Sequence, residues 1–318
     1  LTPDGMVEAR KLREYDQVYV ASPTLTEDQN QVILGSLLGD GSLYWYKKPL
    51  HGRITTKKGC EVPSFKEAHS IKQEDYLLWK SRALSNLDIT VSYRSMSYKW
   101  KNENRKSDAI EMWASRAPSL YKYRLLCYED KNKKISWGWL KDLNALGLAV
   151  WIYDDGNFSV NKRCTPWRVY LRIAMMPTEK KEIVNIWRYF SEKWDLYPKL
   201  TPLKQKSKAW QVMFTVNDSK KILDIISPYI AVDIDHRTAK KKWIAPDIPV
   251  GDKDGMEAVP IIANKEISLS RSVSAYDVTI EPTHTIVAQR LITSNCALVQ
   301  ALREAYPQEF ANMLSPEE

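Results

Sequence analysis

Two aspartates in this sequence each follow an apolar run and precede a glycine. Asp40 comes directly after the run 32–39, and Asp155 comes after the run 146–153 and one further aspartate. Two carboxylates that lie close together repel each other unless a cation lies between them. A hard divalent cation such as Mg²⁺ (or Mn²⁺) binds carboxylate, carbonyl and water oxygens. If the two aspartates meet in the fold, the sequence therefore predicts a divalent metal site.

The two apolar runs predict buried helices that position these aspartates. Each run is hydrophobic on almost every side of a helix, which requires burial, and the glycine that follows is typical of a helix end. Gly156 lies 115 positions after Gly41, and an amphipathic helix is predicted after each motif, over 71–80 and 178–187. The chain therefore contains an internal duplication. A single aspartate before glycine would most simply accept amide hydrogen bonds at a turn, but the duplicated pair favours the metal site.

Basic side chains on predicted strands are a second chemical feature. In the segment 168–173, arginine and tyrosine alternate with aliphatic residues, which places the two kinds on opposite faces of a strand. The candidate polyanion contacts of both halves are Arg53, Thr55, Lys57, Arg94, Lys99, Lys101, Arg168, Tyr170, Arg172, Lys204, Lys206 and Lys208. A solvated sheet face explains any one such strand, but not four that consistently lack acids. The net charge of +8 and the pI near 9.1 agree with binding of a polyanion.

A metal site between cationic sheets would face phosphate groups. This combination is typical of phosphodiester hydrolysis, in which metals activate a water and stabilise the leaving oxygen. The residues also resemble a known family, the LAGLIDADG homing endonucleases in their monomeric two-repeat form. The family motif corresponds to residues 33–41 and 148–156, family-like segments occur at 67–73 and 227–230, and the resemblance covers roughly residues 26–243.

The resemblance implies both a fold and an activity. The fold class would be α+β, with two pseudo-symmetric αββαββα repeats that form a DNA-binding saddle. The activity would be that of a monomeric, site-specific homing endonuclease. Such an enzyme hydrolyses phosphodiester bonds of both strands of a long double-stranded DNA target with a divalent metal, and it leaves 3′ overhangs.

By the same resemblance, Asp40 and Asp155 would bind the catalytic metals, with help from the carbonyls of Gly39 and Asp154. The family also places a basic residue near each metal. In the first half this residue would be Lys134, the second member of a Lys-Lys pair shortly before the second motif.

The basic residue of the second half stays open between two candidates. Arg237 is the position that the resemblance favours, and Lys240 is its rival. An arginine binds phosphate well but is a poor proton shuttle, because it stays charged.

The last part of the chain resembles the C-terminal splicing blocks of inteins, so that the endonuclease would be intein-encoded. The matching segments are 276–281, 284–288 and 294–296. By this resemblance Asn295 would cyclise to cut the chain, Cys296 would be the first residue of the C-extein, and His284 would assist. A β-hairpin with an incidental Asn-Cys pair is the alternative.

The beginning of the chain also resembles an intein. Residues 1–22 look like an early intein segment, but they contain no nucleophilic cysteine or serine in the expected block, and no Thr-x-x-His block precedes the endonuclease motifs. The sequence therefore predicts that this chain does not splice by the full pathway, whereas cleavage after Asn295 can still occur. The two chain ends together would form a small β-rich splicing region.

The predicted organisation has five parts. They are an N-terminal intein-like remnant (1–25), a first repeat (26–140), a second repeat (141–245), a linker with the C-terminal splicing region (246–296) and a C-extein segment (297–318). No run approaches the roughly 20 apolar residues of a membrane-spanning helix, so a cytoplasmic protein without membrane contact is expected. The four cysteines form no C-x-x-C pair, and they predict neither a zinc site nor a disulfide framework.

Two other classes of function remain as alternatives. A catalytically degenerate, maturase-like protein would bind nucleic acid without cutting it, although the presence of both aspartates favours a nuclease. A self-processing intein would cut its own chain after Asn295 and carry the central domain as a passenger.

Overall fold

The structure is a computed structural model of the chain. It describes residues 17–45, 63–100, 103–161, 168–176, 179–202, 209–234, 239–260, 285–288 and 291–294. The chain divides into two compact units. The larger one comprises Leu25–Lys48 and Glu61–Asp252, and the smaller one comprises Leu1–Thr24, Pro49–Cys60 and Lys253–Glu318.

The first half of the larger unit has the element order αββαββα. Its elements are α1 (Glu27–Leu38), β2 (Ser42–Tyr44), β3 (Ser64–Ser70), α2 (Glu74–Ala83), β4 (Ile89–Trp100), β5 (Glu103–Ala114) and α3 (Tyr121–Cys127). Short 3-10 turns occur at Ile71–Gln73, Ser85–Leu87 and Pro118–Leu120. The four strands form an antiparallel sheet in the order β2-β3-β5-β4.

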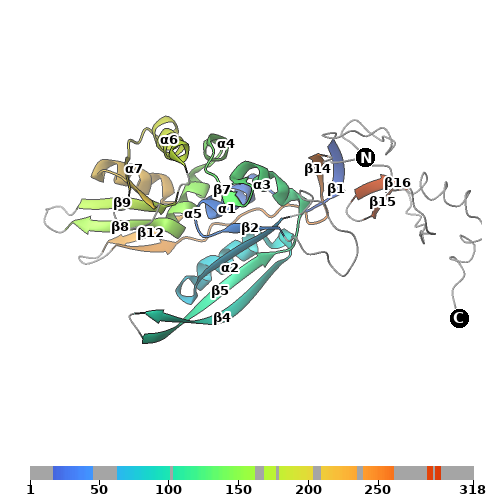
Figure 1. The fold of residues 1–318 in the computed structure, drawn as a ribbon, viewed down its shortest axis with the longest axis horizontal. Coiled ribbons are helices and arrows are strands. Elements are labelled where there is room, and N and C mark those ends of the chain that lie inside the picture. The colour runs from blue at the N-terminus through green and yellow to red at the C-terminus, as the bar shows by residue number, and fades with distance from the viewer. Residues whose placement is uncertain are drawn as a thin grey trace, which may run out of the picture. The chain divides into compact units, whose positions relative to one another are not determined.

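The second half repeats this order of elements. They are α5 (Ala145–Asp155), β8 (Gly156–Asn161), β9 (Arg168–Met175), α6 (Lys180–Arg188), β10 (Lys199–Pro202), β11 (Trp210–Met213) and α7 (Val216–Ile226), with a π-helical turn at Tyr189–Lys193. The sheet order β8-β9-β11-β10 is the counterpart of β2-β3-β5-β4. Figure 1 shows α6 and α7 on one side of this second sheet. The prediction of two αββαββα repeats is confirmed.

A short β-hairpin follows each repeat. After the first repeat come β6 (Tyr128–Glu129) and β7 (Asn132–Lys133), and after the second come β12 (Ile230–Ile234) and β13 (Ala239–Trp243). The short helix α4 (Trp137–Lys141) connects the first hairpin to α5. The hairpins extend the pseudo-symmetry beyond the seven elements of each repeat.

The helices α1 and α5 pack side by side in the centre of the larger unit (Figure 1). Thr26 begins α1 with a capping box in which its hydroxyl accepts from the Gln29 backbone, and Asn144 caps the first turn of α5. Glycine allows the two helices to approach closely. A Cβ added at Gly35 would lie 2.4 Å from the carbonyl oxygen of Gly147 and 2.8 Å from the Cβ of Val150.

Replacing Gly35 by alanine is therefore expected to destabilise the protein. The added methyl group would meet main-chain atoms of α5, which cannot move as a flexible side chain can. The expected loss is about 1–3 kcal/mol in the free energy of unfolding, although alanine has the higher helix propensity. Urea denaturation measures this loss. Gly138→Ala in α4 is the matched control, because its Cβ would meet only the Leu126 side chain at 3.3 Å, and equal stability of the two variants would contradict the argument.

The smaller unit contains a four-stranded sheet built from both ends of the chain. Its strands are β14 (Met256–Pro260), β1 (Gln17–Ala21), β16 (Leu291–Ser294) and β15 (Thr285–Ala288), in the order β14-β1-β16-β15. Strand β1 pairs along its whole length with β14, and Val20 pairs with Leu291 of β16. The expected β-rich region from the two chain ends is therefore present. Its candidate splicing residues His284, Asn295 and Cys296 lie outside the described residues.

Candidate active site

The two predicted metal-binding aspartates meet where α1 and α5 end. Asp40 follows Gly39, the C-cap of α1, and Asp155 is the last residue of α5. Burial raises the pKa of Asp155 to about 7, and the negative charges of Asp40 and Asp154 add to this shift. The three acids therefore lie close enough for their charges to act on one another.

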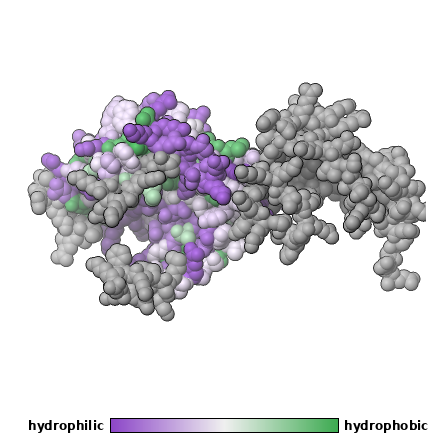
Figure 2. Space-filling view, viewed as in Figure 1, coloured by the Kyte–Doolittle hydropathy of each residue, from purple (hydrophilic) through white to green (hydrophobic). Residues whose placement is uncertain are grey.

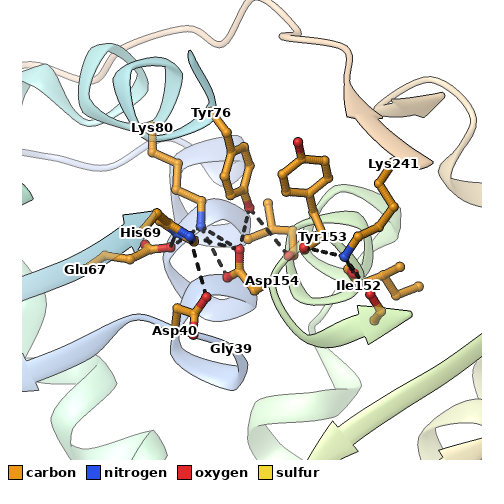
Figure 3. Close-up of polar contacts among 12 residues, drawn as sticks. Gly39, Asp40, Glu67, His69, Tyr76, Lys80, Ile152, Tyr153, Asp154 and Lys241 are labelled. Atoms are coloured by element: carbon orange, nitrogen blue, oxygen red, sulfur yellow. Dashed lines mark hydrogen bonds and ion pairs between the residues drawn. The ribbon is translucent and has the colours of Figure 1, made fainter. Parts of the chain in front are cut away.

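Asp154 has a role that the sequence did not suggest. Its fully buried carboxylate accepts from the Tyr76 hydroxyl at 2.9 Å and from the Lys80 ammonium at 3.3 Å. Burial raises the pKa of Asp154 to about 6. The carboxylate lies directly against Gly39, where an added Cβ would be 2.6 Å from Oδ2. The glycine of the first motif thus makes room for the extra acid of the second (Figure 3).

Two further residues, Glu67 and His69, complete a charged cluster on the side of the first repeat (Figure 3). They alternate on β3, so both side chains point inward, and both are buried. The imidazole Nε2 lies 2.7 Å from Glu67 Oε1, and Nδ1 lies 3.5 Å from Asp40 Oδ2. Lys80 also binds Glu67. Sequence reasoning gave His69 no role, although two polar residues at i and i+2 on a buried strand face were a usable signal.

A lysine from each hairpin binds the carbonyl oxygens at the end of one central helix. Lys133 Nζ donates to the carbonyl oxygens of Gly39 at 3.2 Å and Gly41 at 2.5 Å. Lys241 Nζ donates to three carbonyl oxygens, those of Ile152 at 2.9 Å and of Tyr153 and Gly156 at 2.6 Å each. Burial lowers the pKa of both lysines, and that of Lys241 falls to about 8. The pseudo-symmetry of the fold extends to this pair of ammonium groups.

The basic residues at the helix ends are therefore not the ones expected from the resemblance. Lys134 does not reach the helix end, because its ammonium pairs with Glu129 and Glu179 instead. In the second hairpin the rival Lys240 is exposed, since neighbouring residues of a strand point to opposite faces and Lys241 is the one that turns inward. Arg237 lies outside the described residues.

The expected DNA-binding side chains are described in part. On β9, Arg168 and Arg172 are exposed and Tyr170 is half-buried, while the residues between them are buried, as the alternation predicted. Arg94 is 44% exposed and pairs with Glu111 at 3.1 Å, so part of its charge is neutralised within the sheet. Figure 2 shows that hydrophilic residues prevail over much of the described surface in view.

The other expected contacts stay predictions. Lys99 lies in β4, of which only the backbone is described at this position, and Arg53, Thr55, Lys57, Lys101, Lys204, Lys206 and Lys208 lie outside the described residues. Within the described part of the chain, no helix is both long and apolar enough to cross a membrane.

The raised pKa of Asp155 predicts a pH-dependent effect of divalent cations on stability. Because the folded-state pKa of about 7 exceeds the ordinary value of 3.8, this group contributes stability below about pH 4 that is lost as the pH rises through 7. A divalent cation binds the ionised carboxylate, and its binding recovers the stability that is lost on ionisation. Mg²⁺ is therefore expected to raise the Tm more at about pH 8 than at about pH 5.5. Thermal unfolding with Mg²⁺ and with EDTA measures the difference, and an equal effect at both values would contradict it.

Comparisons with known proteins agree with this geometry. The model of the LAGLIDADG DNA endonuclease family matches residues 30–222. Protein RecA of Mycobacterium shimoidei is 26% identical over 305 residues, which cover 92% of this chain and 67% of that protein. Protein RecA of Mycobacterium leprae (strain TN) is 25% identical, and the match covers 92% of this chain but 40% of that protein.

A solved structure shares the fold. The homing endonuclease I-WcaI bound to its DNA recognition sequence has a TM-score of 0.50 and 19% sequence identity, and the match covers 65% of this chain and 84% of that chain. The family model covers more than half of the sequence and includes most of α1, all of α5, Asp40 and Asp155. This chain belongs to the LAGLIDADG DNA endonuclease family.

Proposed function

We propose that this protein is a site-specific homing endonuclease that hydrolyses both strands of a long double-stranded DNA target with Mg²⁺ or Mn²⁺. The observation that carries this proposal is the meeting of Asp40 and Asp155 at the ends of α1 and α5, each beside an inward-pointing lysine. One chain supplies both acids and both lysines. We therefore propose that it acts as a monomer.

The donor atoms at this place fit a hard divalent cation. Carboxylate and main-chain oxygens are the ligands that Mg²⁺ prefers. Burial raises the pKa of Asp155, and repulsion by Asp40 and Asp154 adds to the shift; a cation relieves this repulsion. Asp40 and Asp155 would hold the cation, and its chemical contribution when bound is to make water more acidic and to polarise the phosphate.

The two inward lysines have the position for proton transfer, and burial lowers the pKa of both. Each ammonium group lies at the carbonyl oxygens beside one catalytic aspartate. With a pKa of about 8, Lys241 can release and regain a proton near neutral pH, which suits general acid–base work on a phosphodiester. Before the transfer, its positive charge attracts the phosphate.

Replacement of each of the two neighbouring lysines, Lys133 and Lys134, tests this assignment. Lys133→Met is expected to slow cleavage by about 10²–10⁴-fold, the usual contribution of a positioned proton donor. Lys134→Met is the matched control, and it should leave the rate nearly unchanged because Lys134 pairs with Glu129 and Glu179. Single-turnover cleavage gives both rates. If Lys134→Met slows cleavage more than Lys133→Met does, Lys134 is the basic residue of the first half, as the family resemblance implied.

The DNA would lie on the cationic sheet faces. Exposed arginines such as Arg168 and Arg172 contact phosphates or guanine edges well. Such binding releases counterions, so the affinity should fall steeply with salt.

The decisive experiment for the proposed function is cleavage of a randomised duplex library by the purified chain, with Mg²⁺ and with EDTA, followed by sequencing of the ends. Metal-dependent cuts at one long motif with staggered 3′ ends would support the proposal. Tight binding without cleavage would instead support a catalytically degenerate binder.

We further propose that the endonuclease is intein-encoded. The pairing of β1 with both β14 and β16 brings the two chain ends into one sheet, as a domain interrupted by an insert requires. The partial coverage of the Mycobacterium leprae protein also agrees with an insert in a longer protein. Incubation followed by mass determination tests self-processing. A fragment that begins at Cys296, and that is absent from Asn295→Ala, would support it, whereas an intact chain would oppose it.

A further inference from the structure

The two repeats differ in chemistry next to their catalytic aspartates. On the side of the first repeat, β3 contributes Glu67 and His69. With Gly41 matched to Gly156, the pair Ser42–Lys66 corresponds to the pair Asn157–Arg172. Glu67 and His69 therefore correspond to Ile173 and Met175 of the second repeat. Both of these residues are buried and carry no ionisable group, and Met175 lines a pocket beside Asp155. Among the residues that the structure describes, the pseudo-symmetric site is therefore flanked by an imidazole on one side only.

The contacts of His69 determine which ring nitrogen carries its proton. The Glu67 carboxylate is fully buried beside the Lys80 ammonium, so it is ionised and can only accept. Its neighbour Nε2, 2.7 Å away, must therefore be the donor. This leaves Nδ1 with a lone pair in the neutral ring. Nδ1 is buried, has no hydrogen-bond partner, and faces Asp40 Oδ2 at 3.5 Å (Figure 3).

A lone pair that faces a carboxylate oxygen is unfavourable unless a proton or a metal cation lies between them. A cation requires only a small adjustment of the observed spacing, because two neighbouring octahedral ligand bonds of about 2.1 Å span about 3.0 Å, and Nδ1 lies 3.5 Å from Asp40 Oδ2. Ligand atoms of Asp40, His69 and Asp154 all lie within 4.8 Å of one another. A histidine that binds a metal almost always donates its other nitrogen to a carboxylate or carbonyl. Glu67, His69 and Asp40 have this arrangement.

We propose that His69 is a nitrogen ligand of the divalent cation at Asp40, so that the metal positions of the two repeats have different ligand sets. The inference rests on the proposed function, since it concerns the same cation. Imidazole is a ligand of transition metals, whereas Mg²⁺ is bound mainly through oxygen. The position at Asp40 therefore favours Mn²⁺ and similar ions over Mg²⁺.

Pulsed electron paramagnetic resonance of Mn²⁺ bound to the full chain tests this ligand directly. The wild-type protein is expected to show nitrogen hyperfine coupling from one imidazole. The coupling should disappear in His69→Gln, and it should persist in the matched control His284→Gln, which removes another of the four histidines. Mn²⁺ affinity should fall by at least about tenfold in His69→Gln, and Mg²⁺ affinity should fall less.

A measurement on the wild-type chain avoids dependence on the folding of a variant. Labelling of histidine alone with nitrogen-15 should change the coupling pattern, because histidine nitrogens change their nuclear spin while the nitrogens of all other residues do not. An unchanged pattern would overturn the inference.

Three results are distinguishable. In the first, Mn²⁺ binding depends on Asp40 but shows no nitrogen coupling. This result would overturn the role of His69 and leave the endonuclease proposal intact. The contact between His69 and Asp40 would then be an ion pair. Coupling that survives in His69→Gln would have the same consequence. Loss of all Asp40-dependent metal binding would overturn both proposals.

Discussion

Cleavage of double-stranded DNA is expected to fall by about a thousandfold or more when Asp155 is replaced by asparagine, because a carboxylate that holds the metal contributes several kcal/mol to the transition state. The same substitution should raise the stability of the metal-free protein. At neutral pH the ionised carboxylate is partly buried and is repelled by Asp40 and Asp154. Asparagine keeps the shape and removes the charge, so activity and stability should change in opposite directions.

Two assays separate these effects. Single-turnover cleavage measures the loss of activity, and thermal unfolding in EDTA measures the gain of stability. Asp142→Asn, which changes an exposed aspartate after α4, is the matched control and should alter neither quantity. Asp40→Asn should also abolish cleavage. DNA binding should survive in both active-site variants, and its loss in both would show that the aspartates have a structural rather than a catalytic role.

The sequence predicted those parts of the site that depend on local patterns and on duplication. The apolar runs and the glycines are local features, and they sufficed to predict α1 and α5. The alternation of Arg168 and Arg172 with aliphatic residues likewise predicted which face of β9 is exposed. These features follow from helix and strand periodicity, whereas the approach of Asp40 to Asp155 was inferred from the duplication.

The choice of basic residue could not be predicted in the same way. Lys133 and Lys134 are chemically identical neighbours, and only the register of the β6–β7 hairpin decides which one turns towards Gly39. A shift of one residue reverses every side chain of a strand. Lys240 and Lys241 present the same problem on β13, where the outcome depends on pairing with β12.

The buried cluster around Lys80 depends on long-range packing. Lys80 belongs to an amphipathic helix, where a lysine is ordinarily exposed, yet its side chain is fully buried. Its burial follows from the approach of α2, β3 and the end of α5, whose residues are far apart in the sequence. The additional acid of the second motif, Asp154, was the only local sign that a cation would be needed nearby.

Lys80→Met is expected to destabilise the protein by about 3–5 kcal/mol, the usual result when one member of a buried charge cluster is removed. Lys80 lies between the carboxylates of Glu67 and Asp154, and its ammonium also lies 4.3 Å from the centre of the Tyr76 ring. Without it, two acids share a buried site with no positive charge between them. The pKa of Asp154, already raised by burial, should rise further, and the pKa of Glu67, which Lys80 helps to hold low, should rise as well. The loss of stability should therefore grow as the pH increases from about 5 to 8.

A second substitution should reverse this loss if its cause is electrostatic. Asp154→Asn removes one of the two uncompensated charges and keeps an acceptor for the Tyr76 hydroxyl, so Lys80→Met with Asp154→Asn should be more stable than Lys80→Met alone. Urea denaturation at several pH values measures each variant, and Lys72→Met, at an exposed position before α2, is the matched control. Equal destabilisation with and without Asp154→Asn, at every pH, would mean that Lys80 stabilises the site by packing of its aliphatic stem rather than by charge. In that case the fold alone would hold Glu67 and Asp154 apart, and the charge of Lys80 would contribute little to the stability of the site.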